Sequence, residues 1–259
     1  MLIDSHAHLG DDKLFSNWKA ILERAQMVGL NAVVDICTDV ITLERGLLIQ
    51  ASNPPIPVFL TAATTPHDVE AEGDLFFKRV EEAVLKKQLV AIGETGLDYY
   101  YEHSPKQTQK KHLIKYFNLA KMANLPLVFH CREAFGDLFD LADLEYSNAS
   151  ALLHCFTGTL DEAKQVLKRG WGLSFSGIVT FKKSTQLHEV LKYAPLEKIF
   201  IETDAPYLAP QTKRGFCNEP SFILETAQFI ADLKGVSLEE VAETTSRNAR
   251  EFFSLALNR

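Results

Sequence analysis

The chain has 259 residues, which is enough for one large α/β barrel or two small domains. Its net charge of −7 argues against general electrostatic binding to duplex nucleic acid, although bound cations could still attract a phosphate group locally. It has no apolar run near the roughly 20 residues that cross a bilayer, no signal-peptide pattern and no closely spaced cysteines, so we expect a cytoplasmic protein with reduced thiols and no membrane partner.

Short apolar runs alternate with longer amphipathic segments along the whole chain. The runs predict eight strands, at Leu2–Ser5, Ala32–Ile36, Val58–Ala62, Val90–Gly93, Leu127–His130, Ala151–His154, Gly172–Ser176 and Lys198–Glu202. The amphipathic segments predict helices at Lys19–Val28, Leu75–Lys87, Gln107–Ala123, Ala134–Leu144, Leu160–Arg169, Ser184–Tyr193, Phe222–Lys234 and Ser237–Leu257. Strands separated by helices in this way fit a single-domain (β/α)8 TIM barrel over residues 1–259. An open, doubly wound sheet is the competing architecture, because strand count alone does not show that a barrel closes.

Two histidines close the first predicted strand. His6 and His8 are separated by one residue, so on an extended backbone their side chains share a face. Imidazole is the commonest metal ligand near neutral pH, so this pair could hold one ion. A His-x-His pair alone is weak support for a metal site, and the prediction therefore depends on the other strand ends.

Four later strand ends also carry ligand-type side chains, and the C-terminal strand ends of a barrel gather at one rim. They are Glu94 after the fourth strand, His130 at the fifth, His154 at the sixth and Asp204 after the eighth. Four imidazoles and two carboxylates suit two borderline divalent cations. A lone histidine here is commonly structural, Glu94 could cap a helix and Asp204 could start a turn. The metal site is favoured because those plainer readings would have to hold independently at five strand ends.

Five motifs together resemble the TatD family of metal-dependent deoxyribonucleases. They are Ser5-His6-Ala7-His8, Gly93-Glu94-Thr95-Gly96-Leu97-Asp98-Tyr99, His130-Cys131-Arg132-Glu133-Ala134, His154-Cys155-Phe156-Thr157-Gly158 and Glu202-Thr203-Asp204-Ala205-Pro206-Tyr207. They follow one another in the family's order over nearly the whole chain. The resemblance implies a metal-dependent TIM barrel of the amidohydrolase type that hydrolyses phosphodiester bonds in DNA.

The resemblance also implies which residues hold which ion. His6, His8, Glu94 and Asp204 would hold one divalent ion, and Glu94, His130 and His154 would hold the second, with Glu94 bridging. The ions could be Mg²⁺, Mn²⁺ or Zn²⁺, because mixed histidine and carboxylate ligands accept all three. Two cations about 3.5–4 Å apart could activate a water molecule and neutralise the phosphate together. We assign Asp204 as the catalytic proton acceptor and Glu94 as the second catalytic residue.

Residues next to these motifs are candidates for substrate contact. The family usually has Gly-x-His-Pro-His after the third strand, whereas this chain has Thr65 in place of the first of these histidines. His67 is kept, and it could touch substrate or begin a helix. Arg132 could reach the substrate or pair with the acid that follows it, and Arg214 could bind a phosphate or lie in a solvated turn. Tyr99 or Tyr100 could stack on a base, and at least one of them could instead pack on the barrel rim.

Three further residues have predicted supporting roles. Asp98 is a candidate for orienting a ligand histidine from behind, a common need in metal sites. Cys131 and Cys155 each follow a proposed histidine ligand. Side-chain alternation turns both thiols toward the helix layer, so we expect them to be buried packing residues.

The leading hypothesis is a metal-dependent deoxyribonuclease, an exonuclease acting on single-stranded DNA ends, with no obligate protein partner. One rival is an amide, lactone or ester hydrolase on the same scaffold, for example an aminoacyl-RNA deacylase. Many amidohydrolase relatives of that kind carry a carbamylated lysine where this chain has Glu94. The other rival is a non-enzymatic metal-dependent binding protein, with Thr65 and Cys217 as signs of decay. Against that rival, every predicted ligand is present.

Overall fold

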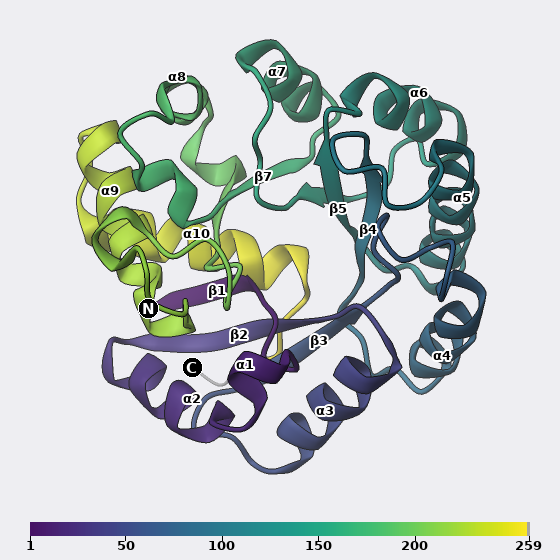
Figure 1. The fold of residues 1–259 in the computed structure, drawn as a ribbon. Coiled ribbons are helices and arrows are strands. Elements are labelled where there is room, and N and C mark those ends of the chain that lie inside the picture. The colour runs from purple at the N-terminus through teal and green to yellow at the C-terminus, as the bar shows by residue number, and fades with distance from the viewer. Residues whose placement is uncertain (258–259) are drawn as a thin grey trace.

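The computed structural model describes residues 1–257, in which eight parallel strands each pair with the next strand in chain order (Figure 1). The strands are β1 (Leu2–Ala7), β2 (Leu30–Cys37), β3 (Val58–Ala62), β4 (Ala91–Asp98), β5 (Leu127–Arg132), β6 (Ala151–Leu153), β7 (Gly172–Phe175) and β8 (Ile199–Ile201). The chain after β8 returns to β1 through a parallel bridge between Ala7 and Ala205, where the Ala205 carbonyl accepts the His8 N–H at 2.7 Å. The strands therefore form a nearly closed barrel, as predicted, and the open sheet is excluded.

Helices form an outer layer around the strands (Figure 1). The α-helices are α1 (Asp12–Phe15), α2 (Trp18–Met27), α3 (Val40–Ala51), α4 (Gly73–Leu85), α5 (Lys106–Ala123), α6 (Phe135–Glu145), α7 (Leu160–Lys168), α8 (Thr185–Tyr193), α9 (Ile223–Lys234) and α10 (Leu238–Phe252). Short 3-10 helices are η1 (Gly177–Thr180), η2 (Leu196–Lys198), η3 (Gln211–Lys213) and η4 (Pro220–Phe222). Among the helices of residues 1–257, none has the length and apolar character to span a bilayer.

The strands are buried on both faces, because helices cover the outside of the barrel and side chains fill the inside. One cluster joins inward-facing residues of several strands to α10 and the residues after it. Its members are Ile3, Ala32, Val34, Ile36, Ala91, Val128, Leu152, Phe200, Ala249, Phe253 and Leu255. Gly172 of β7 makes room for one of them, since a Cβ there would lie 2.5 Å from the Phe200 ring. With the interior filled, polar side chains gather at the C-terminal strand ends.

Three strands end at least two residues later than the sequence pattern predicts. β1 continues to Ala7, β4 to Asp98 and β5 to Arg132. The last three residues of β4 pair in register with the last three residues of β5, so hydrogen bonding continues after the apolar runs have stopped. As a result, several ligand-type residues lie within strands and their backbones are fixed by the sheet.

Helix α3 is missing from the predicted elements. Its first turn is closed by a capping box, in which the Asp39 carboxylate accepts the Thr42 N–H at 2.7 Å. The helix has apolar residues on its exposed side as well, such as Ile41 and Leu48, and this obscures the amphipathic stripe. The last predicted helix also differs: α10 ends at Phe252, before Ser254 adopts a positive φ of 52°.

Candidate metal centre

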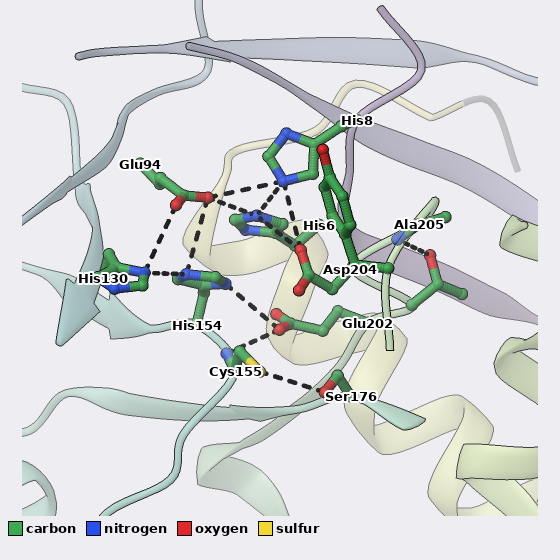
Figure 2. Close-up of polar contacts among 12 residues, drawn as sticks. His6, His8, Glu94, His130, His154, Cys155, Ser176, Glu202, Asp204 and Ala205 are labelled. Atoms are coloured by element: carbon green, nitrogen blue, oxygen red, sulfur yellow. Dashed lines mark hydrogen bonds and ion pairs between the residues drawn. The ribbon is translucent and has the colours of Figure 1, made fainter. Parts of the chain in front are cut away.

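Six ligand-type side chains converge at the C-terminal ends of the strands (Figure 2). They are His6 of β1, His8 just after it, Glu94 of β4, His130 of β5, His154 after β6 and Asp204 after β8. The barrel thus brings the two ends of the chain and its middle to one place, because all parallel strands finish at the same rim. The structure brings together all six residues that the sequence analysis selects as ligands.

The first group contains His6, His8 and Asp204, whose ligand atoms all lie within 4.8 Å of one another. The Nε2 atoms of the two histidines are 3.3 Å apart. Oδ1 of Asp204 lies 3.3 Å from Nε2 of His8 and 3.6 Å from Nε2 of His6. Two imidazole nitrogens and a carboxylate oxygen therefore face one small volume, which is the donor set of a borderline divalent cation.

The second group contains Glu94, His130 and His154. Nδ1 of His130 lies 3.2 Å from Nε2 of His154 and 3.5 Å from Oε1 of Glu94. Nε2 of His154 lies 3.7 Å from Oε2 of Glu94. This group repeats the chemistry of the first, with two imidazole nitrogens and a carboxylate around one point.

Glu94 lies between the two groups (Figure 2). Its Oε2 atom is 2.8 Å from Nε2 of His6, while Oε1 faces His130. Although His6 is so close, no residue in the described part of the chain makes a well-directed hydrogen bond to the buried Oε2 atom. In each group two imidazole nitrogens also face each other, at 3.3 Å and 3.2 Å, and can share a single proton. The unsatisfied Oε2 atom and the two facing nitrogen pairs fit a pair of cations that share Glu94.

The carboxylates of the centre stay ionised, and nearby acids raise the pKa of three of its imidazoles, those of His8, His130 and His154. Burial alone would lower the pKa of His8, but the hydrogen bond with Asp204 and the charge of Glu94 raise it to about 9. Burial opposes protonation of His130 too, whereas hydrogen bonds with Asp98 and Glu94 raise its pKa to about 9. Burial would raise the pKa values of Glu94 and Asp204, but the surrounding histidines hold both below their ordinary values. The two carboxylates are therefore available as anionic ligands, and a cation must displace protons from the imidazoles.

Two further carboxylates contact the outer nitrogens of the second histidine pair. Oδ2 of Asp98 lies 2.9 Å from Nε2 of His130, the orienting contact that the sequence predicts. Oε1 of Glu202 lies 3.5 Å from Nδ1 of His154 and accepts the Cys155 N–H at 2.7 Å. The Asp98 hydrogen bond orients the His130 ring and leaves Nδ1 for a metal, whereas Nδ1 of His154 has no well-directed hydrogen bond in residues 1–257 and is only near the Glu202 charge. Glu202 is not among the predicted site residues, although its position two residues before Asp204 on the same strand end is a usable signal.

Buried acids also fix the backbone around the first group. The Asp4 carboxylate accepts the Thr203 N–H at 2.9 Å and the Thr203 hydroxyl at 2.6 Å, so it ties β1 to the segment after β8. The Asp35 carboxylate accepts the Leu9 N–H at 2.7 Å and thereby holds the turn after His8. Burial raises the pKa of each carboxyl to about 7. Neither residue is selected by the sequence analysis, because an acid inside an apolar strand has no partner that the sequence identifies.

A cavity of about 890 Å³ opens over the centre, and His130, His154 and Asp204 form part of its floor. His67 and Arg132, both predicted substrate contacts, line its wall. These two residues are therefore in reach of a bound molecule. Thr65, the departure from the family motif, instead donates its hydroxyl to the Asp68 carboxylate at 2.8 Å.

The other two predicted substrate contacts lie elsewhere. The Tyr99 hydroxyl donates to Asp137 at 2.6 Å, and the ring is outside the residues that line the cavity. The Arg214 guanidinium packs 4.8 Å from the centre of the Phe181 ring on an exposed loop. The structure brings neither of them to the cavity, since the loops that carry them are anchored to other residues.

The two cysteines beside the ligand histidines differ from expectation. Cys131 is buried as predicted, but Cys131 and Cys155 both line the cavity instead of facing the helix layer alone. Cys155 has a positive φ of 41°, so the alternation of an extended strand no longer applies at this position. Its Sγ atom lies 3.3 Å from the Ser176 hydroxyl (Figure 2).

Parallel barrels with histidines and acids gathered at this rim are typical of metal-dependent hydrolases, and the fold and the donor set place this protein in that class. The TatD-related DNase family model matches residues 3–254. The chain therefore belongs to the TatD family of metal-dependent hydrolases, as its motifs predict.

Individual relatives agree with this assignment. An uncharacterized metal-dependent hydrolase, YabD, from Bacillus subtilis is 36% identical over 261 residues, which cover 98% of this chain and 100% of that protein. A protein from Pantoea vagans named as the 3′-5′ ssDNA/RNA exonuclease TatD is 28% identical over 98% of this chain and its own full length. The crystal structure of a TatD family hydrolase from Entamoeba histolytica has a TM-score of 0.87 and 27% identity, with 97% of each chain covered.

Proposed function

We propose that this protein hydrolyses phosphodiester bonds in DNA and that it works from single-stranded ends. The observation that carries the proposal is Glu94, whose carboxylate lies between two histidine pairs, with Oε2 nearest His6 and Oε1 facing His130, beneath an open cavity. A shared carboxylate between two cation sites is the arrangement used to activate water against a phosphate ester. The name of the Pantoea vagans relative and the description of the family support the same substrate class.

The substrate's charge explains why such a centre is needed. A phosphodiester anion repels a hydroxide nucleophile, and the protein itself carries a net charge of −7. Two divalent ions, held by His6, His8, Glu94 and Asp204 and by Glu94, His130 and His154, would supply local positive charge and lower the pKa of a bound water. Attraction to the nucleic acid is then concentrated at the scissile phosphate rather than spread over the surface.

Asp204 has the position of a proton acceptor for the attacking water. Its carboxylate lines the cavity, and its lowered pKa keeps it ionised at neutral pH. Oδ1 contacts the first histidine pair, so the group can hold a water molecule near the same point. Arg132 lines the cavity as well and has no carboxylate within 4 Å in residues 1–257, which leaves its guanidinium available for a phosphate.

The proposal is tested with protein reconstituted with Mg²⁺, Mn²⁺ or Zn²⁺ and end-labelled single- and double-stranded oligonucleotides. We expect mononucleotides to appear from single strands, and Asp204→Asn and Glu94→Gln each to reduce the rate by at least about 100-fold. Glu23→Gln, at an exposed position on α2, is the matched control and should leave the rate unchanged. Circular dichroism checks that each variant is folded.

An aminoacyl-ester substrate is incubated in parallel with the oligonucleotides. Turnover of that ester with intact oligonucleotides would favour the deacylase alternative and contradict the nuclease. Unchanged hydrolysis of DNA in both the Asp204→Asn and the Glu94→Gln variants would reject the assigned roles of these residues. Absence of turnover on every substrate would favour a binding protein.

A further inference from the structure

An aromatic surface follows β4 and forms one side of the cavity. Tyr100 and Tyr101 are each about half exposed, at 52% and 51%, and the Tyr101 ring lines the cavity. The Tyr101 ring centre lies 5.7 Å from that of His67, which in turn lies 5.4 Å from that of His130. A single imidazole ring thus separates Tyr101 from the candidate metal ligands. His103 contacts both Tyr101 and His67 and extends the surface outward.

Arg132 is held against the same tyrosines. Its guanidinium carbon lies 3.7 Å from the Tyr100 ring centre and 4.8 Å from that of Tyr101. No carboxylate in the described part of the chain pairs with it. Two aromatic faces therefore orient a cation that keeps its hydrogen-bond donors free for an anionic ligand.

The loop is fixed relative to the candidate metal centre by one carboxylate. Oδ1 of Asp98 accepts the N–H groups of Tyr100 and Tyr101 at 3.0 and 2.8 Å. Oδ2 of the same residue contacts His130 at 2.9 Å. Because Asp98 contacts both, the distance between the aromatic surface and the centre is set by the fold. The Tyr99 hydroxyl is hydrogen-bonded to Asp137 and its ring does not line the cavity. Tyr101 does line the cavity, so its ring is the one of this loop that a bound ligand can contact.

We propose that Tyr101 stacks on an unpaired nucleobase of the nucleic acid whose phosphate lies at the centre, while Arg132 binds the backbone of the same nucleotide. Stacking on an aromatic side chain needs a free base face, which a base inside a duplex does not offer. The combination of a π surface, an oriented cation and an adjacent centre for a phosphate matches the base and the phosphate backbone of a nucleotide. This inference rests on the proposed nuclease function and gives a structural reason for a preference for single strands.

The test compares two single-stranded oligonucleotides, one intact and one with three abasic nucleotides at the labelled end. We expect the protein to cleave the intact strand with about tenfold higher kcat/KM than the abasic strand. Tyr101→Ala should lose about tenfold on the intact strand, mainly through KM, and should no longer discriminate between the two. Tyr101→Phe keeps the ring and should behave as the unchanged protein. Tyr193→Ala removes an equally exposed tyrosine on α8 and is the control for a general effect of such a change.

Several outcomes would overturn the stacking proposal. If the unchanged protein cleaves intact and abasic strands equally well, Tyr101 does not stack on a base. Equal losses on both strands in Tyr101→Ala would show a structural role for the ring. If no oligonucleotide is cleaved at all while an aminoacyl ester is, the proposed function fails and the stacking proposal fails with it. Cleavage without discrimination leaves the nuclease intact and rejects stacking alone.

Discussion

His8 and His130 decide how the centre responds to pH. Carboxylates on Asp204, Glu94 and Asp98 raise the pKa of each imidazole to about 9 in the metal-free protein, although burial works in the opposite direction. Below about pH 9 both rings carry a second proton and are positively charged, whereas a metal ion binds the neutral ring. A cation must therefore displace these protons, and its affinity should rise as the pH rises toward 9.

Proton release measures this competition. At pH 7.5 we expect Zn²⁺ or Mn²⁺ binding to release at least about two protons per chain, because acids raise the pKa of His154 as well as those of His8 and His130. Titration calorimetry in two buffers with different ionisation enthalpies measures this release. His130→Gln removes one of the three imidazoles whose pKa is raised and should release about one proton fewer on binding. Binding without proton release, or with an affinity independent of pH between 6 and 9, would contradict the assignment of these rings as ligands.

The residues of the centre differ in how far the sequence predicts them. The six ligand-type residues are predictable because each one closes an apolar run, and barrel strands end at one rim. Glu202 and Asp35 are not, since their roles depend on partners such as His154 and the Leu9 N–H that only the folded chain brings near. Tyr101 is not distinguished from its neighbours, because the hydrogen bond that removes Tyr99 from the cavity comes from α6.

Strand β4 joins the candidate centre to the aromatic surface. It carries Glu94 at its middle and Asp98 at its end. Between them, Gly96 has a φ of +152°, and a Cβ there would lie 1.9 Å from the carbonyl oxygen of His130. Only glycine allows β4 to approach β5 closely enough for the two strands to stay in register at the centre.

Gly96→Ala should consequently destabilise the protein and disturb the second cation group. We expect the free energy of unfolding to fall by more than about 2 kcal/mol, measured by urea denaturation, because the backbone of β5 must move. Gly136→Ala is the matched control: no atom lies within 4 Å of its Cβ position on α6, and stability should stay equal or rise slightly. Equal effects of the two substitutions would argue against a steric role for Gly96.

The sequence predicts whether a segment is a helix or a strand better than it predicts the residues at which that element begins and ends. The alternation of apolar runs and amphipathic segments predicts all eight strands, since fully buried parallel strands read as continuous apolar stretches. The extension of β4 and β5 is set by pairing with each other, which local pattern does not contain. Helix α3 is missed because its exposed apolar residues, such as Ile41, hide the helical period.

At the scale of the whole molecule, closure of the barrel brings the residues of the candidate metal centre together. The bridge between Ala7 and Ala205 brings His8 and Asp204 together, although they come from opposite ends of the chain. The packed interior, which includes α10, gives the rim a rigid base. For the proposed nuclease function, a protein of net charge −7 would have to hold its nucleic-acid substrate through local features, namely the candidate cation sites and Arg132.

The most direct test of a dinuclear centre is anomalous diffraction from crystals of the protein loaded with Zn²⁺ or Mn²⁺. We expect two anomalous peaks about 3.5–4 Å apart on either side of Glu94. One should lie beside His6, His8 and Asp204, and the other beside His130 and His154. A single peak, or two peaks away from Glu94, would contradict the account.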